Sequence, residues 1–172
     1  MEIYGYSERG MLNSLFFEIF YNNKVELLQK LLSSIQFRDG KRVFELINAQ
    51  IYIEQSLSDF GDSDAILLIE DKSSKYTVFI EAKVKTSQRK QWSIKNEIRN
   101  FENGIQKNKV NSSNLLTQLI YKSWLIKTLK DNNWKNTLQN GVIPNLPTSK
   151  EKRKMGNNQV VKSMIERIKD YS

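Results

Sequence analysis

The order of apolar and polar positions divides the chain into helical and extended stretches. Residues 7–36 repeat apolar side chains every three or four positions, with Leu12 and Ile19 two turns apart on one face. This spacing predicts amphipathic helix, and the polar pair at 22–23 interrupts it, so two helices are expected. The charged, glycine-containing residues 37–42 predict a turn after them.

Three strands are expected next, at residues 43–55, 64–70 and 76–84, because these stretches are rich in β-branched and aromatic residues. The polar residues 71–75 predict a hairpin turn between the second and third strands. Both of these strands carry apolar side chains at consecutive positions. This predicts a central place in a sheet that is covered on both faces.

The rest of the chain is predicted to be helical, apart from one long loop. Residues 87–107 predict an exposed amphipathic helix, and residues 112–130 a stronger helix that serines cap and lysines end. Both prolines and the basic run KEKRK place a loop at 140–159, before a last helix at 158–170. Helices that flank a run of strands indicate an α/β (α+β) fold, and residues 1–172 are expected to form a single domain.

The amino-acid composition removes several classes of chemistry. The 172 residues include no cysteine, which excludes disulfides, thiolate metal sites and cysteine nucleophiles. They include no histidine either, which excludes a Ser-His-Asp triad and zinc held by imidazole. Catalysis would therefore rest on carboxylates, lysine, tyrosine, hydroxyls or a metal ion held by oxygen atoms.

The charge of the chain points to anionic partners. Its formal net charge is +8 and its isoelectric point is near 9.5. This excess favours nucleic acid first and acidic membranes second, and a basic surface that serves solubility alone is the alternative. No stretch approaches the roughly 20 apolar residues of a membrane span. The first ten residues lack the basic start and apolar core of a signal peptide, so a cytoplasmic protein without a membrane partner is expected.

An acid interrupts the third predicted strand, YTVFIEAKVK, where Glu81 and Lys83 lie two positions apart. Alternation along a strand would put these two side chains on one face, with Ala82 opposite. A carboxylate can hold a hard cation, and a nearby amine can orient water or stabilise developing negative charge. An ion pair at the end of the strand is the structural alternative. Asp64 opens the preceding strand, so a hairpin would bring it beside Glu81, and two carboxylates suffice for Mg²⁺, which keeps several waters.

This order of residues resembles the PD-(D/E)XK nuclease superfamily, which has the restriction-endonuclease-like fold. The signature of that family is an acid at the start of one strand, here Asp64, and a D/E-x-K triplet in the next, here EAK at 81–83. Ser63 stands where the usual proline would be. The RecB-like branch adds a Q-x-x-Y element, matched by QLIY at 118–121, and often a glutamate in the first helix, matched by Glu8.

Each of the two added matches has a plain structural alternative. Gln118 and Tyr121 share a helix face and could both contact one phosphate, but a surface amide beside a tyrosine packed in the core has the same spacing. Glu8 could assist a metal, but an acid in the first turn also suits the dipole of any helix.

The resemblance spans about residues 7–125 and implies a restriction-endonuclease-like core. That core has a central mixed sheet, in which a hairpin carries the site, flanked by helices. The family continues after the Q-x-x-Y helix with another apolar strand, whereas residues 131–157 offer only GVIP. Either GVIP forms a short strand, or the sheet is completed differently, or this chain lacks that part of the core.

The resemblance implies a metal-dependent nuclease that hydrolyses phosphodiester bonds of nucleic acid, in restriction, repair or phage defence. DNA is favoured over RNA as the substrate, and the sequence leaves both open. Asp64, Glu81 and the Ala82 carbonyl would hold Mg²⁺ or Mn²⁺. Lys83 would orient the attacking water, and Glu8 would assist the metal through water. The residues expected to hold nucleic acid are Gln118, Tyr121, Lys85, Arg89, Lys90, Trp92 and Lys95.

Three other outcomes stay open. The basic residues after the third strand would form only a solvated helix face if the chain holds no nucleic acid. The same fold could bind nucleic acid without cutting it, or could be a subunit that cuts only with its partner. Restriction-like members often form homodimers to cut both strands, and the sequence leaves the oligomeric state open.

Overall fold

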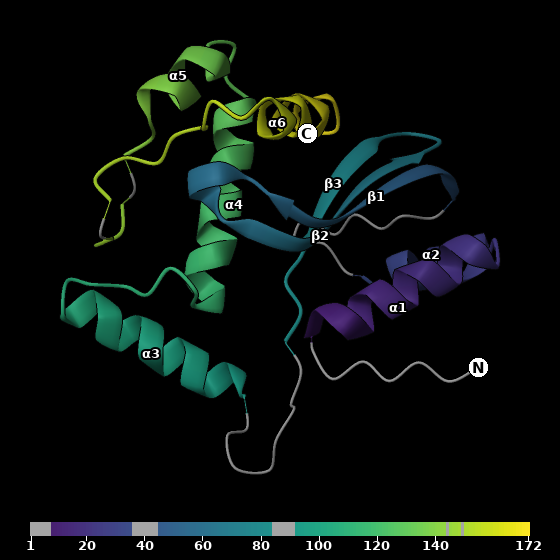
Figure 1. Cartoon of the computed structure of the whole chain (residues 1–172), viewed down its shortest axis with the longest axis horizontal. Coiled ribbons are helices and arrows are strands. Elements are labelled where there is room, and N and C mark those ends of the chain that lie inside the picture. Colours follow the sequence, from purple (N-terminus) through teal and green to yellow (C-terminus); the bar gives the residue numbers. More distant parts are fainter. Residues whose placement is uncertain (1–7, 36–44, 84–91, 144, 149) are drawn as a thin grey trace.

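The computed structural model describes residues 8–35, 45–83, 92–143, 145–148 and 150–172 (Figure 1). The described helices are α1 (Glu8–Tyr21), α2 (Val25–Ser34), α3 (Ile94–Gln106), α4 (Leu115–Leu129), α5 (Trp134–Asn140) and α6 (Gln159–Asp170), with one 3-10 turn, η1 (Ser58–Phe60). None of these helices is long and apolar enough to cross a membrane. The expected α/β class is confirmed, and the predicted turn at 37–42 lies outside the described residues.

Three strands form one sheet, with β2 (Asp62–Asp71) between β1 (Leu46–Ser56) and β3 (Lys75–Ile80). The register aligns Ala65 of β2 with Ile53 of β1 and with Ile80 of β3. The expected hairpin between β2 and β3 is confirmed. All pairings between the described strands are antiparallel, so the mixed sheet that the resemblance implied is not found among them.

Helices cover both faces of this sheet, as Figure 1 shows. The side chains of residues 65–69 in β2 alternate between the two faces of the sheet, and each is at most 1% exposed. Ala65, Leu67 and Ile69 belong to the hydrophobic cluster on the side of α1 and α2. Ile66 and Leu68 belong to the cluster on the side of α4, α5 and α6. The consecutive apolar residues of the sequence thus correspond to burial on both faces.

Two helices, α1 and α2, cover the first face, and the chain breaks between them where the sequence predicts a break. Phe16 of α1 and Leu32 of α2 are buried against the sheet. Between them Asn23 has a positive φ of 48°, a conformation that asparagine tolerates better than most residues. The break at the polar pair is therefore confirmed.

The second face holds the larger cluster. It includes Tyr121 and Leu125 of α4, Leu138 of α5, and Ile165 and Ile168 of α6, all 2% exposed or less. The last predicted helix is confirmed as α6, and α5 is a short helix that no pattern in the sequence indicated. In the described part of the loop after it, Val142 and Arg153 form an antiparallel bridge, and no strand there joins the sheet.

Two predicted boundaries are wrong near the hairpin and α4. β3 ends at Ile80, four residues before the expected end, so Glu81 and Lys83 follow the strand and strand alternation does not place them on one face. The cap of α4 is Asn114, whose side chain accepts a hydrogen bond from Leu116 N at 3.0 Å, and not one of the preceding serines. Asparagine and serine cap helices equally well, so the sequence did not separate them.

Candidate active site

The two acids singled out in the sequence lie at the open end of the β2–β3 hairpin. Ala65 and Ile80 form the last β2–β3 pair, so Asp64 and Glu81 are the next residues on the two chains. The backbone N–H of Ala82 donates to Asp64 Oδ2 at 2.8 Å. This bond fixes the chain after β3 against the start of β2. The predicted approach of Asp64 to the EAK segment is therefore observed.

Glu81 is held from the other side by a lysine of α4. Lys122 Nζ lies 2.8 Å from Glu81 Oε1, and both side chains are only 3% exposed. Ser63 Oγ donates to the same oxygen at 3.3 Å. A buried carboxylate requires such partners, because removing an ion from water costs several kcal/mol unless charge and hydrogen bonds compensate.

The ammonium of Lys122 has a second fixed contact. It donates to the carbonyl oxygen of Asp62 at 2.7 Å. Gly61, with φ of 82°, precedes that residue, and a Cβ at Gly61 would lie 3.3 Å from Lys122 Nζ. A glycine here both permits the positive φ and leaves room for the ammonium. Lys122 is thus anchored between the start of β2 and Glu81.

The remaining predicted residues belong to different segments of the chain. Lys83 is partly buried just after Ala82, Glu8 is the first residue of α1, and Lys95 is exposed at the start of α3. Trp92 is partly buried, and its indole Nε1 has no hydrogen-bond partner among the described residues. The basic residues Lys85, Arg89 and Lys90 lie outside the described part of the chain.

Gln118 lies on the same face of α4 as Lys122, one turn before it. The side-chain oxygen Oε1 of Gln118 is buried and has no hydrogen-bond partner among the described residues. A buried acceptor without a donor costs about 1–3 kcal/mol, so this oxygen is suited to accept a bond from a group outside the described residues.

Tyr121 is packed into the core instead of facing a ligand. It is 2% exposed, and its hydroxyl accepts a hydrogen bond from Arg153 Nη2 at 2.7 Å. The guanidinium also lies over the ring, with Cζ 4.3 Å from the centroid. Burial raises the pKa of Tyr121, although Arg153 and Thr148 oppose the shift, so the phenol stays neutral. The spacing of Gln118 and Tyr121 does not bring both side chains to one ligand position.

The oxygen atoms at the hairpin opening are of the type that Mg²⁺ and Mn²⁺ bind. The bonds described above use Oδ2 of Asp64 and Oε1 of Glu81, and Ala82, next to Glu81 in the chain, has a backbone carbonyl. Within the described residues, no cluster of three or more Asp, Glu, His or Cys is arranged to hold a metal. Mg²⁺ needs only one or two carboxylates because it retains several waters, so the small oxygen set fits that ion.

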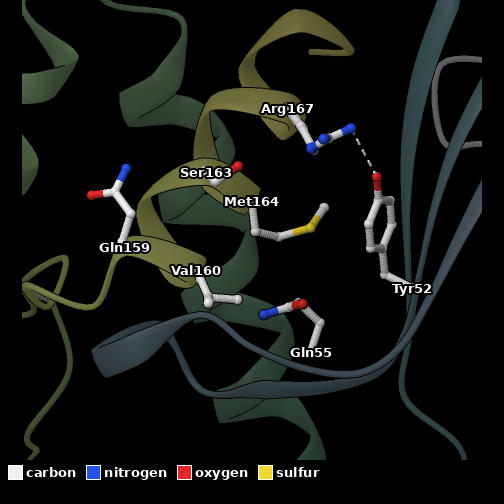
Figure 2. Close-up of a pocket in the computed structure, with 7 residues that line it drawn as sticks. All are labelled: Tyr52, Gln55, Gln159, Val160, Ser163, Met164 and Arg167. Atoms are coloured by element: carbon white, nitrogen blue, oxygen red, sulfur yellow. Dashed lines mark hydrogen bonds between the residues drawn. The ribbon is translucent and has the colours of Figure 1, made fainter.

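A separate hollow of about 300 Å³ lies between β1 and α6, away from these acids in the chain. Figure 2 shows Tyr52 and Gln55 of β1 facing Met164 and Arg167 of α6 across it. Arg167 Nη1 donates to Tyr52 Oη at 3.2 Å. None of the described residues that line this hollow is a carboxylate, so it does not share the chemistry of the hairpin opening.

Two charged residues of this region were missed in the sequence. Lys122 follows QLIY directly, and its only signal is that a lysine stands beside mostly apolar neighbours in the helix. Arg153 belongs to the basic run KEKRK, where nothing distinguishes it from exposed neighbours, yet it is 6% exposed.

Comparison of the chain with protein-family models, curated proteins and solved structures gives no match.

Proposed function

We propose that this protein is a metal-dependent nuclease that hydrolyses phosphodiester bonds of nucleic acid, DNA rather than RNA, on a restriction-endonuclease-like core. The observation that carries the proposal is the meeting of Asp64 with the EAK segment, joined by the bond from Ala82 N to Asp64 Oδ2. Asp64 and Glu81 stand, with sixteen residues between them, in the order that the resemblance requires, and the β2–β3 hairpin returns the chain so that Ala82 contacts Asp64. The net charge of +8 supports a polyanionic substrate.

The proposed roles follow from the chemistry of each group. Asp64, Glu81 and the Ala82 carbonyl would hold Mg²⁺ or Mn²⁺. The bound ion lowers the pKa of a coordinated water and polarises the scissile phosphate. Lys83 would orient the attacking water and stabilise negative charge that develops on the phosphate oxygens.

The basic residues beyond the hairpin would hold the backbone of the nucleic acid. Lys95 is exposed on α3 and is available for this purpose. Gln118 presents an acceptor oxygen and would bind a metal-coordinated water or a donor group of the substrate. Tyr121 would support the site from within the core and not by direct contact.

A cleavage assay tests the proposal. Plasmid and single-stranded DNA are incubated with Mg²⁺ or Mn²⁺ and the wild-type protein, Asp64→Asn or Lys83→Ala. We expect metal-dependent cleavage by the wild type and roughly a hundredfold loss in either variant, the scale for removing one group that stabilises charge in the transition state. Asp64→Asn retains an oxygen that can accept from Ala82 N, so the fold should persist.

The control for Asp64→Asn is Asp62→Asn, which removes an exposed carboxylate two residues earlier on the same strand. The control should cleave like the wild type. Equal rates for the wild type, Asp64→Asn and Lys83→Ala would remove the catalytic assignment.

A non-catalytic module that holds nucleic acid is the second candidate. The observation that favours it is the burial of Glu81 and Lys122, each 3% exposed, since a closed ion pair can be purely structural. Such a module would bind DNA with an affinity that falls with salt, and no divalent ion would produce cleavage. A subunit that needs its partner would stay inactive alone and cleave once the partner is added.

A further inference from the structure

The charges around Glu81 do not by themselves balance those of a divalent cation. Asp64 and Glu81 provide two negative charges, and Lys122 is in direct contact with one of them at 2.8 Å. These three side chains together carry one net negative charge, which is half of the charge that would neutralise a divalent cation. Lys83, two residues after Glu81, adds a further positive charge close by in the chain.

The positive charge of Lys122 belongs in this charge balance because its ammonium is fixed beside Glu81. Its ammonium is anchored by the Asp62 carbonyl and by Glu81, and its side chain is 3% exposed. At such burial water screens the charges weakly, so one unit of charge changes the affinity for a dication strongly. Gly61, with φ of 82°, has no side chain and so leaves the space next to this ammonium open.

We infer that the Glu81–Lys122 pair makes metal binding depend on the substrate. This inference rests on the proposed nuclease function and adds its regulation: the free protein binds a single divalent cation weakly, and a phosphodiester supplies the missing negative charge. The metal and the nucleic-acid backbone therefore bind cooperatively at Asp64 and Glu81. Lys122 acts on the metal through Glu81 and is a positioning residue.

Calorimetric titration of the wild-type protein with Mn²⁺ measures this coupling directly. The titration is performed with the protein alone and with a short phosphorothioate duplex, which keeps the backbone charge and resists cleavage. We expect the affinity for Mn²⁺ to rise about tenfold to hundredfold in the presence of the duplex, which is the usual range of coupling between two sites. The affinity for the duplex must rise by the same factor when Mn²⁺ is present, because coupling is reciprocal.

A duplex with methylphosphonate linkages is the matched ligand control, since it has similar shape but an uncharged backbone. We expect it to leave the affinity for Mn²⁺ unchanged. An affinity for Mn²⁺ that is the same with both duplexes and without either would overturn the inference.

Lys122→Met tests the residue itself, because methionine fills similar space without charge. In this variant Mn²⁺ replaces the ammonium as the counter-ion of Glu81. We expect tighter Mn²⁺ binding in the absence of a duplex, a coupling factor near one, and a larger rise of Tm with Mn²⁺ than in the wild type. Lys127→Met, which removes an exposed lysine from the same helix, should behave like the wild type.

The titrations separate this inference from the proposed function. Metal-dependent cleavage together with an unchanged Mn²⁺ affinity would overturn only the coupling. A wild-type protein that binds no Mn²⁺ with or without the duplex, and cleaves nothing, would overturn both. If Lys122→Met does not fold, the comparison of the three wild-type titrations decides the question alone.

Discussion

Buried charged residues decide how the candidate site is built. Glu81 could be recognised in the sequence, because an acid inside an apolar stretch has a cost that only a partner or a ligand offsets. Lys122 could not be recognised, because lysine is common on helices and its burial depends on which face of α4 meets the sheet. The same is true of Arg153, whose stacking on Tyr121 joins residues 32 positions apart.

Tyr121 gives the first test at the residue scale. Tyr121→Phe removes the acceptor of Arg153 Nη2 and leaves a buried guanidinium N–H unpaired. We expect a loss of about 1–2 kcal/mol in the free energy of unfolding, measured by urea denaturation. Tyr52→Phe removes a hydroxyl at the more exposed contact with Arg167 and should cost less.

The outcome also separates the two roles of Tyr121. If it supports the core, Tyr121→Phe leaves the salt dependence of DNA binding as in the wild type. A variant with unchanged stability and a reduced salt slope would show instead that the hydroxyl contacts phosphate.

At the scale of elements, the sequence predicted whether a segment is a helix or a strand better than it predicted the residue at which the segment ends. The hairpin and the long helices follow from apolar spacing, which is a property of the local chain. The end of β3 does not, because no glycine or proline marks a stop after Ile80, and the Ala82 N–H donates to the Asp64 carboxylate, a contact that strand propensity does not foresee. The helix α5 has only seven residues, too few for a periodic signal.

The start of α4 gives a prediction for one element. Asn114 accepts from Leu116 N, and its Nδ2 donates to the Glu97 carbonyl oxygen at 2.9 Å, so it caps α4 and ties it to α3. We expect Asn114→Ala to lower the free energy of unfolding by about 1–2 kcal/mol. Ser113→Ala should have a much smaller effect, because Ser113 is exposed and its bonds within the described part of the chain go to Asn111. If Ser113→Ala lowers the free energy of unfolding more than Asn114→Ala does in urea denaturation, then a serine and not Asn114 caps α4.

At the scale of the molecule, the sheet joins two hydrophobic clusters into one fold. The sequence predicted that both faces of the sheet are covered, since β2 has apolar side chains at consecutive positions. It did not predict the contacts of the loop after α5, which returns to η1 through Lys154 N and the Asp59 carboxylate. Contacts between residues so distant in the chain leave no periodic pattern.

Two carboxylates make the stability of the whole molecule sensitive to acid. Burial raises the pKa of Asp71, but bonds from Ser73 and Ser74 lower it more, so the net shift is downward from 3.8. The same balance, with Lys150 and Lys154 as the donors, lowers the pKa of Asp59. A lowered pKa stabilises the folded state above the unfolded value of about 3.9, and this contribution disappears as the pH falls through the folded pKa.

Urea denaturation at pH 7 and at pH 3 checks this expectation. Asp71→Asn should be less stable than the wild type at pH 7, and the difference should shrink at pH 3. Glu151→Gln, which changes an exposed acid, should keep the pH dependence of the wild type. A difference between Asp71→Asn and the wild type that grows in acid would contradict the assignment.

The central claim is that Asp64 and Glu81 hold a divalent cation that acts on nucleic acid. The most direct measurement is a crystal structure of the protein grown with Mn²⁺ and a phosphorothioate duplex, with anomalous scattering recorded for manganese. The account predicts one anomalous peak bonded to carboxylate oxygens of Asp64 and Glu81, with a backbone phosphate beside it. Manganese bound elsewhere, or a duplex bound with no manganese at these two acids, would contradict it.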